Sequence, residues 1–352
     1  MLRRLHNLPY PAEARFLAGL LSPQSRLPGS PPPARLAAAA GAHRVVGYLL
    51  DAERSGQIRL PEGIRRQLRA RQAVEAHHAV LLRRELAVVE PVVHGACGVK
   101  PVLIKGPVVA DRLYPDPTLR PFSDLDLVVP RDRLRAAARA LEAEHGYRPE
   151  EEPWSGFGER QGHHVSMVRE HAGHLLSVEL HWRLSDDPAA EQLDHSRLVS
   201  HAGRLPLAEG GALAVPSAED ELVILALHLL HERQKRLVWI NDVALAAERA
   251  SEAEWLGAFA AARGLGLAWV LDRGLDYAAS YLALRRERPP GTVRPPPWGP
   301  LRAEELLGGW PGVQLGRLAL GGWGERDGYV RSAARARRAQ LGHWWRARRA
   351  SR

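Results

Sequence analysis

Two aspartates separated by one residue are candidate metal ligands. Residues 122–130 read FSDLDLVVP, and the apolar run that contains the acids predicts a strand. Alternate side chains of a strand share a face, so Asp124 and Asp126 point to the same side, about 7 Å apart along the chain. Two such carboxylates can converge on one divalent cation or on a pair of cations. Because two aspartates at this spacing are common by chance, the neighbouring segments decide the interpretation.

A lysine–glycine turn precedes the aspartates. Residues 102–107 read VLIKGP, which predicts a short strand followed by Lys105, Gly106 and a helix that opens at Pro107. Glycine lets backbone amides approach a ligand closely, and the start of a helix attracts anions. Lys105 adds a point charge for phosphate oxygens. Lys105 and Gly106 are therefore candidate phosphate ligands, and the alternative is a structural turn with an exposed lysine.

A third acid lies on a later predicted strand. Residues 175–182 read LLSVELHW, so Glu179 and His181 share one face. Two cations about 3.5–4 Å apart, as in phosphoryl-transfer sites, need about three carboxylates to hold them. Glu179 completes such a set, although a solvent-facing strand residue is the alternative. For His181, a structural hydrogen bond is favoured over a role near an acceptor.

The order of these segments resembles a known family. LIKGP, LYPDPTLRPFSDLDLVVP, VELHW and INDVALA, all between residues 100 and 248, are similar to the polymerase-β type of nucleotidyltransferase, in particular to a bacterial group of uncharacterised nucleotidyltransferases. The resemblance implies a small mixed sheet with flanking helices, an NTP donor such as ATP, and magnesium, with two ions expected. It implies that Asp124 and Asp126 ligate metal and that Glu179 is the third acid. The wider superfamily usually has glycine–serine at the anion turn, where this chain has Lys105–Gly106.

Two residues before the aspartates are further candidates for nucleotide binding. Arg120 precedes the predicted strand and is a candidate triphosphate contact, with an ordinary surface arginine as the alternative. Ser123 is a candidate hydrogen-bond donor to phosphate, or it simply begins the strand.

Several histidines and one later aspartate have open roles. His163 and His164 suggest a metal cluster with the nearby acids, but packing or solvated histidines are favoured. His228 and His231 share one side of a predicted helix, and zinc binding is disfavoured there because no cysteine or further ligand pattern supports it. Asp242 either positions an acceptor or has a structural role, and the structural role is favoured.

Apolar periodicity predicts an α+β fold with a small mixed sheet. Helical spacing fills residues 34–97 and 217–284, short strand-like runs lie between 101 and 182, and a helix at 131–145 ends at Gly146. The chain divides into four predicted regions. They are a helical N-terminal region, 1–97, a nucleotidyltransferase core, 98–210, a helical C-terminal region, 211–330, and a basic tail, 331–352.

Composition and charge exclude several classes of protein. The chain of 352 residues has one cysteine, Cys97, which excludes an internal disulfide scaffold and a thiolate zinc cluster. It contains no P-loop motif and no apolar run of the about 18–20 residues that a membrane span needs, so a cytoplasmic location is expected. Eight of the nine net positive charges lie in residues 331–352, and the body is nearly neutral.

The sequence therefore predicts a magnesium-dependent nucleotidyltransferase. It would transfer a nucleoside monophosphate from an NTP to an unidentified acceptor, which is a small molecule, a peptide, a protein or tRNA, and release pyrophosphate. One alternative is a catalytically inactive binding or regulatory module of the same shape. The other is a nucleic-acid-binding protein that acts through its tail, which could also contact an anionic surface.

Overall fold

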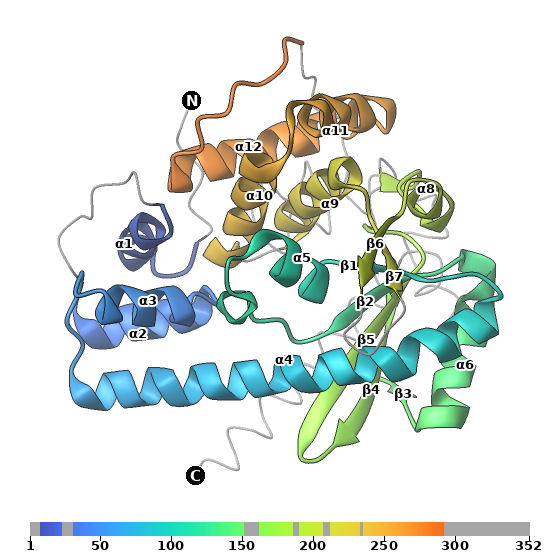
Figure 1. Ribbon diagram of the computed structural model, residues 1–352, viewed down its shortest axis with the longest axis horizontal. Coiled ribbons are helices and arrows are strands. Elements are labelled where there is room, and N and C mark those ends of the chain that lie inside the picture. The colour runs from blue at the N-terminus through green and yellow to red at the C-terminus, as the bar shows by residue number, and fades with distance from the viewer. Residues whose placement is uncertain are drawn as a thin grey trace, which may run out of the picture.

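The computed structural model of the chain contains a seven-stranded sheet enclosed by helices (Figure 1). The expected α+β class with helical flanks is confirmed. The basic tail lies outside the residues that the structure describes. Those residues are 8–22, 31–150, 162–185, 190–206, 212–232 and 235–291.

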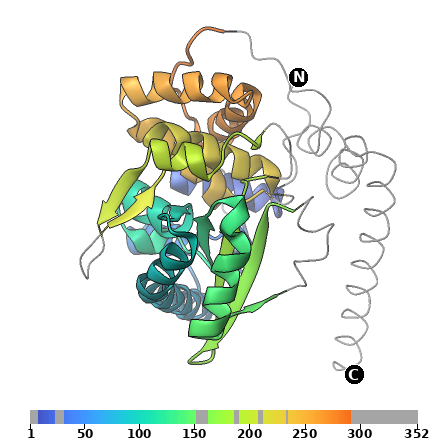
Figure 2. The ribbon, with the colours of Figure 1, turned by 90° about the vertical axis from the view of Figure 1, so that its right-hand side faces the viewer.

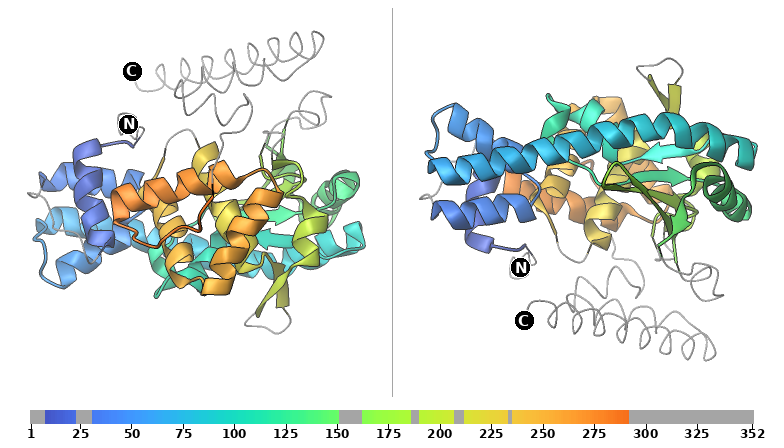
Figure 3. Two further views of the ribbon diagram at one scale, coloured as in Figure 1. Left: turned by 90° about the horizontal axis from the view of Figure 1, so that it is seen from above. Right: turned by 90° about the horizontal axis from the view of Figure 1, so that it is seen from below.

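The N-terminal part consists of three short helices and one long one. These are α1 (Pro11–Leu21), α2 (Pro33–Ala42), α3 (Val46–Arg54) and α4 (Glu62–Cys97). Helix α4 runs beneath α2, α3 and the sheet as a single rod of 36 residues (Figures 1 and 3). Its apolar side chains Leu82, Leu86 and Val89 are buried against the sheet side of the molecule. The predicted helical character of this part is confirmed.

The sheet has the strand order β3-β4-β5-β2-β1-β7-β6. Its strands β2 and β5 run parallel, as do β1 and β7, and the remaining neighbours are antiparallel. The strand bounds are β1 (Val102–Ile104), β2 (Leu125–Val128), β3 (Arg148–Pro149), β4 (His164–His171), β5 (His174–His181), β6 (Gly203–Pro206) and β7 (Ala212–Val215). Strand β7 lies beyond residue 210, so the sheet extends past the C-terminal limit that the sequence predicted for the core.

In the described residues, three short α-helices and two 3₁₀ turns connect or cover the strands. These helices are α5 (Gly106–Leu113) and α6 (Leu134–His145), with the 3₁₀ turns η1 (Pro117–Leu119) and η2 (Arg131–Arg133) between them, and α8 (His195–Ser200). Gly146 adopts a left-handed conformation, with φ of 67°, and ends α6 as the sequence predicted.

The described residues of the C-terminal part form a bundle of four helices. They are α9 (Ala218–His231), α10 (Leu237–Arg249), α11 (Glu252–Gly264) and α12 (Ala268–Leu282). The Ser217 side chain accepts a hydrogen bond from the backbone of Asp220 and caps α9. Figure 2 shows α11 and α12 at the end of the molecule opposite the β4–β5 hairpin. None of the helices in the described residues is long and apolar enough to cross a membrane.

The two faces of the sheet pack against different helices. Leu103, Leu125 and Leu180 belong to one hydrophobic cluster with α4 and α6. Ile104 and Val128 belong to a second cluster, which joins helices α1 to α3 with helices α9, α10 and α12. The N-terminal and C-terminal helices therefore form one core on one side of the sheet.

A fully buried histidine links the two helical parts. The His43 Nε2 atom lies 2.8 Å from the carbonyl oxygen of Pro9, and its Nδ1 atom lies 3.3 Å from the backbone nitrogen of Leu237. A neutral ring meets both demands, donating to the carbonyl and accepting from the amide. Burial is the main reason that the pKa of His43 falls from 6.5 to about 4.

We predict that His43 makes folding sensitive to acid. Because its folded pKa lies below the unfolded value of 6.5, its contribution is present above that pH and is lost as the pH falls toward about 4. The loss would reach about 3 kcal/mol in the free energy of unfolding. Urea unfolding of the wild type and of His43→Gln over this pH range measures it. A pH dependence identical in both proteins would contradict the assignment.

Candidate functional site

Strand register brings the predicted acids together. Parallel pairing of β2 with β5 places Asp126 opposite Glu179, and antiparallel pairing of β1 with β2 places Ile104 opposite Asp126. Residues opposite one another in a sheet project to the same face. Asp124, two residues before Asp126, is close enough for both other carboxylates to raise its pKa. The structure therefore gathers Asp124, Asp126 and Glu179 on one face.

Asp126 is the buried centre of this group. Its Oδ1 atom lies 2.7 Å from Lys105 Nζ and 2.9 Å from His181 Nε2, and the residue is only 3% exposed. Burial opposes ionisation, but Lys105 and the His181 hydrogen bond together hold the pKa of Asp126 well below its usual range. Asp126 is therefore a carboxylate at neutral pH.

Glu179 shares the same histidine. The His181 Nε2 atom lies 3.1 Å from Glu179 Oε2, and His164 Nε2 lies 3.7 Å from Glu179 Oε1. Burial, the largest influence, raises the pKa of Glu179, but the hydrogen bond and charge of His181 together with the charge of His164 make the net shift downward. Burial lowers the pKa of His181, but its hydrogen bonds to Asp126 and Glu179 raise it, and the net shift is upward.

Asp124 differs from the other two acids. Burial, followed by repulsion from Asp126 and Glu179, raises its pKa from 3.8 to about 6. The Ser123 hydroxyl donates to Asp124 Oδ2 at 3.3 Å. Three carboxylates that repel one another offer the hard oxygen donors that Mg²⁺ prefers, and a divalent cation would relieve the repulsion. The donor set therefore fits magnesium.

The lysine–glycine turn adopts a strained conformation beside these acids. Lys105 has φ of 53° and Gly106 has φ of 34°. Residues that carry a Cβ atom, such as Lys105, disfavour positive φ values. A Cβ atom at Gly106 would lie 3.4 Å from the carbonyl oxygen of Asp124, so the turn and the start of β2 approach each other closely. Strained backbone of this kind is frequent at functional sites. Here the side chain of the strained residue Lys105 contacts Asp126 through its Nζ atom.

Arg44 approaches the site from the N-terminal helices and was missed by the sequence analysis. Its Nη2 donates to Ser123 Oγ at 3.2 Å, and it occupies a left-handed position, with φ of 56°, directly after α2. Burial and then the positive charge of Arg236 lower the pKa of Arg44, whereas Asp124 raises it. Arg44 therefore lies near the Asp124 end of the acidic face. No local signal identified Arg44, because arginine is abundant throughout the chain.

Arg120 and Asp242 form a buried ion pair. The Arg120 Nη2 atom lies 2.8 Å from Asp242 Oδ2, and the Tyr114 hydroxyl donates to Asp242 Oδ1 at 2.7 Å. Arg120 Nη1 also donates to the carbonyl oxygen of Pro121. Burial disfavours the charged guanidinium, but Asp242 outweighs it and raises the pKa of Arg120. The structure thus places Arg120 against α10, and Asp124 is close enough to raise the pKa of Arg120 further.

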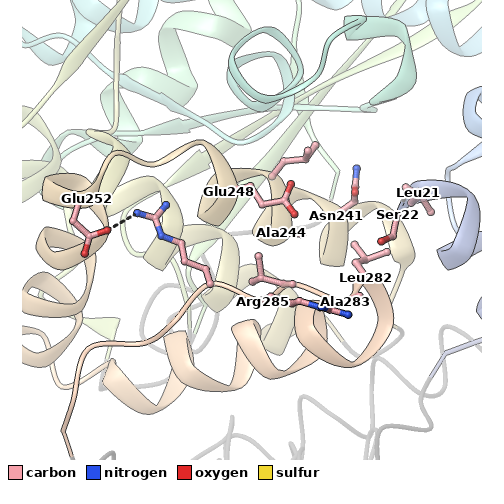
Figure 4. Close-up of a pocket in the computed structure, with 12 residues that line it drawn as sticks. Leu21, Ser22, Asn241, Ala244, Glu248, Glu252, Leu282, Ala283 and Arg285 are labelled. Atoms are coloured by element: carbon pink, nitrogen blue, oxygen red, sulfur yellow. Dashed lines mark hydrogen bonds and ion pairs between the residues drawn. The ribbon is translucent and has the colours of Figure 1, made fainter. Parts of the chain in front are cut away.

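Two cavities differ in their relation to the acids. A cavity of about 160 Å³ is lined by Lys105, Glu179 and His181, and it extends to His228 and His231 of α9. A larger pocket of about 690 Å³ lies among the end of α1, helix α10 and the segment after α12 (Figure 4). Its lining includes Glu248 and Arg285 but none of the predicted site residues. The smaller cavity is the one that adjoins the candidate site.

The comparison with protein families identifies the class of this chain. The family model described as "uncharacterised nucleotidyltransferase" matches residues 30–283. The chain belongs to this family, and the family suspected from the sequence is confirmed. The class of enzyme, a nucleotidyltransferase, is confirmed with it. No curated protein matches the chain.

We predict that the buried ion pair is important for folding. Asp242→Asn leaves the Arg120 charge buried without its counter-charge, which should lower the free energy of unfolding by about 3–5 kcal/mol. Urea denaturation measures the change. The matched control is Asp51→Asn, because Asp51 pairs with Arg54 at 2.6 Å in an exposed position. That control should lose about 1 kcal/mol or less. Equal losses in the two variants would rule out a special role for the buried pair.

Proposed function

We propose that the protein transfers a nucleoside monophosphate from an NTP such as ATP to an acceptor and releases pyrophosphate, with Mg²⁺ as cofactor. The observation that supports this proposal is the placement of Asp124, Asp126 and Glu179 on one face, beside the Lys105–Gly106 turn. Family membership supports the reaction class. The acceptor's identity is left open.

The three carboxylates would hold the metal. Asp124 and Asp126 are the proposed ligands of two Mg²⁺ ions, and Glu179 is the third acid. Bound there, the ions would neutralise charge that develops on the transferring phosphoryl group. Lys105 and His181 keep Asp126 ionised, so the ligand is ready to bind a cation at neutral pH.

The Asp124 end of the acidic face is the proposed position of the triphosphate. Gly106 begins α5, and the first backbone amides of a helix attract phosphate oxygens. Ser123 offers a hydroxyl, and Arg44 offers a guanidinium that donates to that hydroxyl at 3.2 Å. Arg44 is therefore added to Lys105, Gly106 and Ser123 as a phosphate-binding candidate. Arg120 would act indirectly, by fixing the segment before β2 against α10 through Asp242.

The Glu179 end of the face is the proposed position of the acceptor. Glu179 would orient an acceptor hydroxyl and receive its proton. The acceptor oxygen then forms a bond to the α-phosphorus while the bond from that phosphorus to the pyrophosphate oxygen breaks. Positioning the two reactants in line is the main contribution of the protein to this step.

The basic tail remains a proposed contact for nucleic acid or an anionic surface.

Replacing Asp124 separates function from folding. Asp124→Asn removes a proposed ligand and should reduce transfer by at least about 10³-fold, because several kcal/mol of charge stabilisation are lost. The same change removes a charge that Asp126 and Glu179 repel, so thermal stability should be unchanged or higher. The assay incubates the protein with labelled NTPs, Mg²⁺ and a cell extract and asks which molecule acquires label.

The control for this experiment is Asp132→Asn, whose carboxylate has an exposed fraction of 76%. It should transfer label at the wild-type rate. Transfer by Asp124→Asn at the rate of this control would refute the proposed metal site.

Arg44 should affect the nucleotide rather than the chemical step. Arg44→Asn keeps a residue that tolerates the left-handed conformation but removes the guanidinium. We expect the KM for NTP to rise about tenfold or more with little change in melting temperature. Steady-state kinetics with varied NTP measures it, and Arg54→Asn on the neighbouring helix is the exposed control. An unchanged KM would remove Arg44 from the phosphate site.

A further inference from the structure

Three histidines gather at the end of the acidic face that is farthest from Asp124. His164 on β4 lies opposite His181 on β5, and His163 immediately precedes His164. The ring centroids of His164 and His181 are 5.0 Å apart, and those of His163 and His164 are 4.5 Å apart. One nitrogen from each of the three rings lies within 4.8 Å of the others. Strand pairing thus converges three imidazoles on one small volume.

His181 has the hydrogen-bond arrangement of a metal-binding histidine. Its Nε2 contacts the carboxylates of Asp126 and Glu179, at 2.9 and 3.1 Å. Its Nδ1 is buried and has no hydrogen-bond partner among the described residues, and the residue is 3% exposed. Histidines that ligate metals usually donate their other nitrogen to a carboxylate, which fixes the ring and makes the free nitrogen more basic. In the neutral tautomer that donates from Nε2 to these carboxylates, the Nδ1 of His181 is the nitrogen that would bind a metal ion.

His164 offers a second buried nitrogen. Its Nδ1 has no hydrogen-bond partner in the described residues. A neutral imidazole needs no proton removed before it binds a metal. The His231 ring lies beside this group, with its centroid 4.8 Å from that of His163.

The surrounding charges partly offset one another. Glu179 and Glu232 line the cavity beside the three rings and favour a cation, whereas Lys105 opposes one. The positive charge of Lys105 is balanced by Asp126, which it contacts at 2.7 Å. The cavity of about 160 Å³ gives room for an ion and its water ligand.

We propose that His163, His164 and His181 form a binding site for a transition-metal ion of the zinc class, separate from the carboxylate site for Mg²⁺. Three imidazole nitrogens suit Zn²⁺, which binds histidine at about 2.0–2.1 Å, and they suit Mg²⁺ poorly. The site does not depend on the proposed transfer reaction. It lies next to Glu179, and His181 would connect the two sites through its hydrogen bonds to Asp126 and Glu179.

The test measures zinc retained by the full-length protein. Protein stripped with a chelator is incubated with Zn²⁺ in excess Mg²⁺, passed through gel filtration and analysed by mass spectrometry for metals. About one zinc ion per chain is expected for the wild type. His163→Gln and His164→Gln should each weaken zinc binding at least about tenfold. His171→Gln, at the exposed far end of β4, is the matched control and should bind zinc as the wild type does.

Other outcomes decide against the site. Wild-type protein that retains no zinc, or histidine variants that retain it as the control does, would overturn the proposal. Asp124→Asn should keep its zinc even though it loses transfer, and loss of zinc in that variant would place the ion on the carboxylates instead. If the histidine variants do not fold, zinc X-ray absorption of the wild type replaces them. Imidazole nitrogens in the first shell support the site, and oxygen ligands alone refute it.

Discussion

The ionised carboxylate of Asp126 is the constraint that organises the centre of the molecule. A buried charge is costly unless it is paired, and Asp126 obtains its partners from two different strands. Lys105 comes from the end of β1 and His181 from the end of β5, both within 3 Å of the same oxygen atom. A shift of β2 by one residue would turn Asp126 to the opposite face, which packs against α4 and α6, and would break both contacts. The register of three strands and the ionisation of the site are therefore set by the same interactions.

The acidic face has two chemically different ends. Around Asp124 lie Ser123 and Arg44, with the charge of Arg236 close enough to lower the pKa of Arg44. Around Glu179 lie the rings of His164 and His181 and a small cavity. A polyanion such as a triphosphate is attracted to the positive guanidinium at the first end. The histidines at the second end repel it less than carboxylates alone would. This asymmetry supports one direction of binding, with the NTP at Asp124 and the acceptor at Glu179.

The sequence predicted what depends on local periodicity. Alternation along β2 and β5 placed Asp126 and Glu179 on one strand face, and Gly146 marked the end of α6 correctly. It did not predict that Arg120 pairs with Asp242, because 122 residues separate them and only the packing of α10 brings them together. The hairpin of β6 and β7 was not predicted either.

The remaining organisation follows from how the sheet is covered. Ile104 and Val128 lie on the face that carries Asp126, and they are buried in the same hydrophobic cluster as helices from both ends of the chain. His43 adds hydrogen bonds from that cluster to Pro9 and to the start of α10. A fragment restricted to residues 98–210 would expose this apolar face and lose β7, which pairs with β1. The helical regions are thus parts of the environment that keeps Asp126 buried, and the electrostatics of the candidate site depend on the whole described chain.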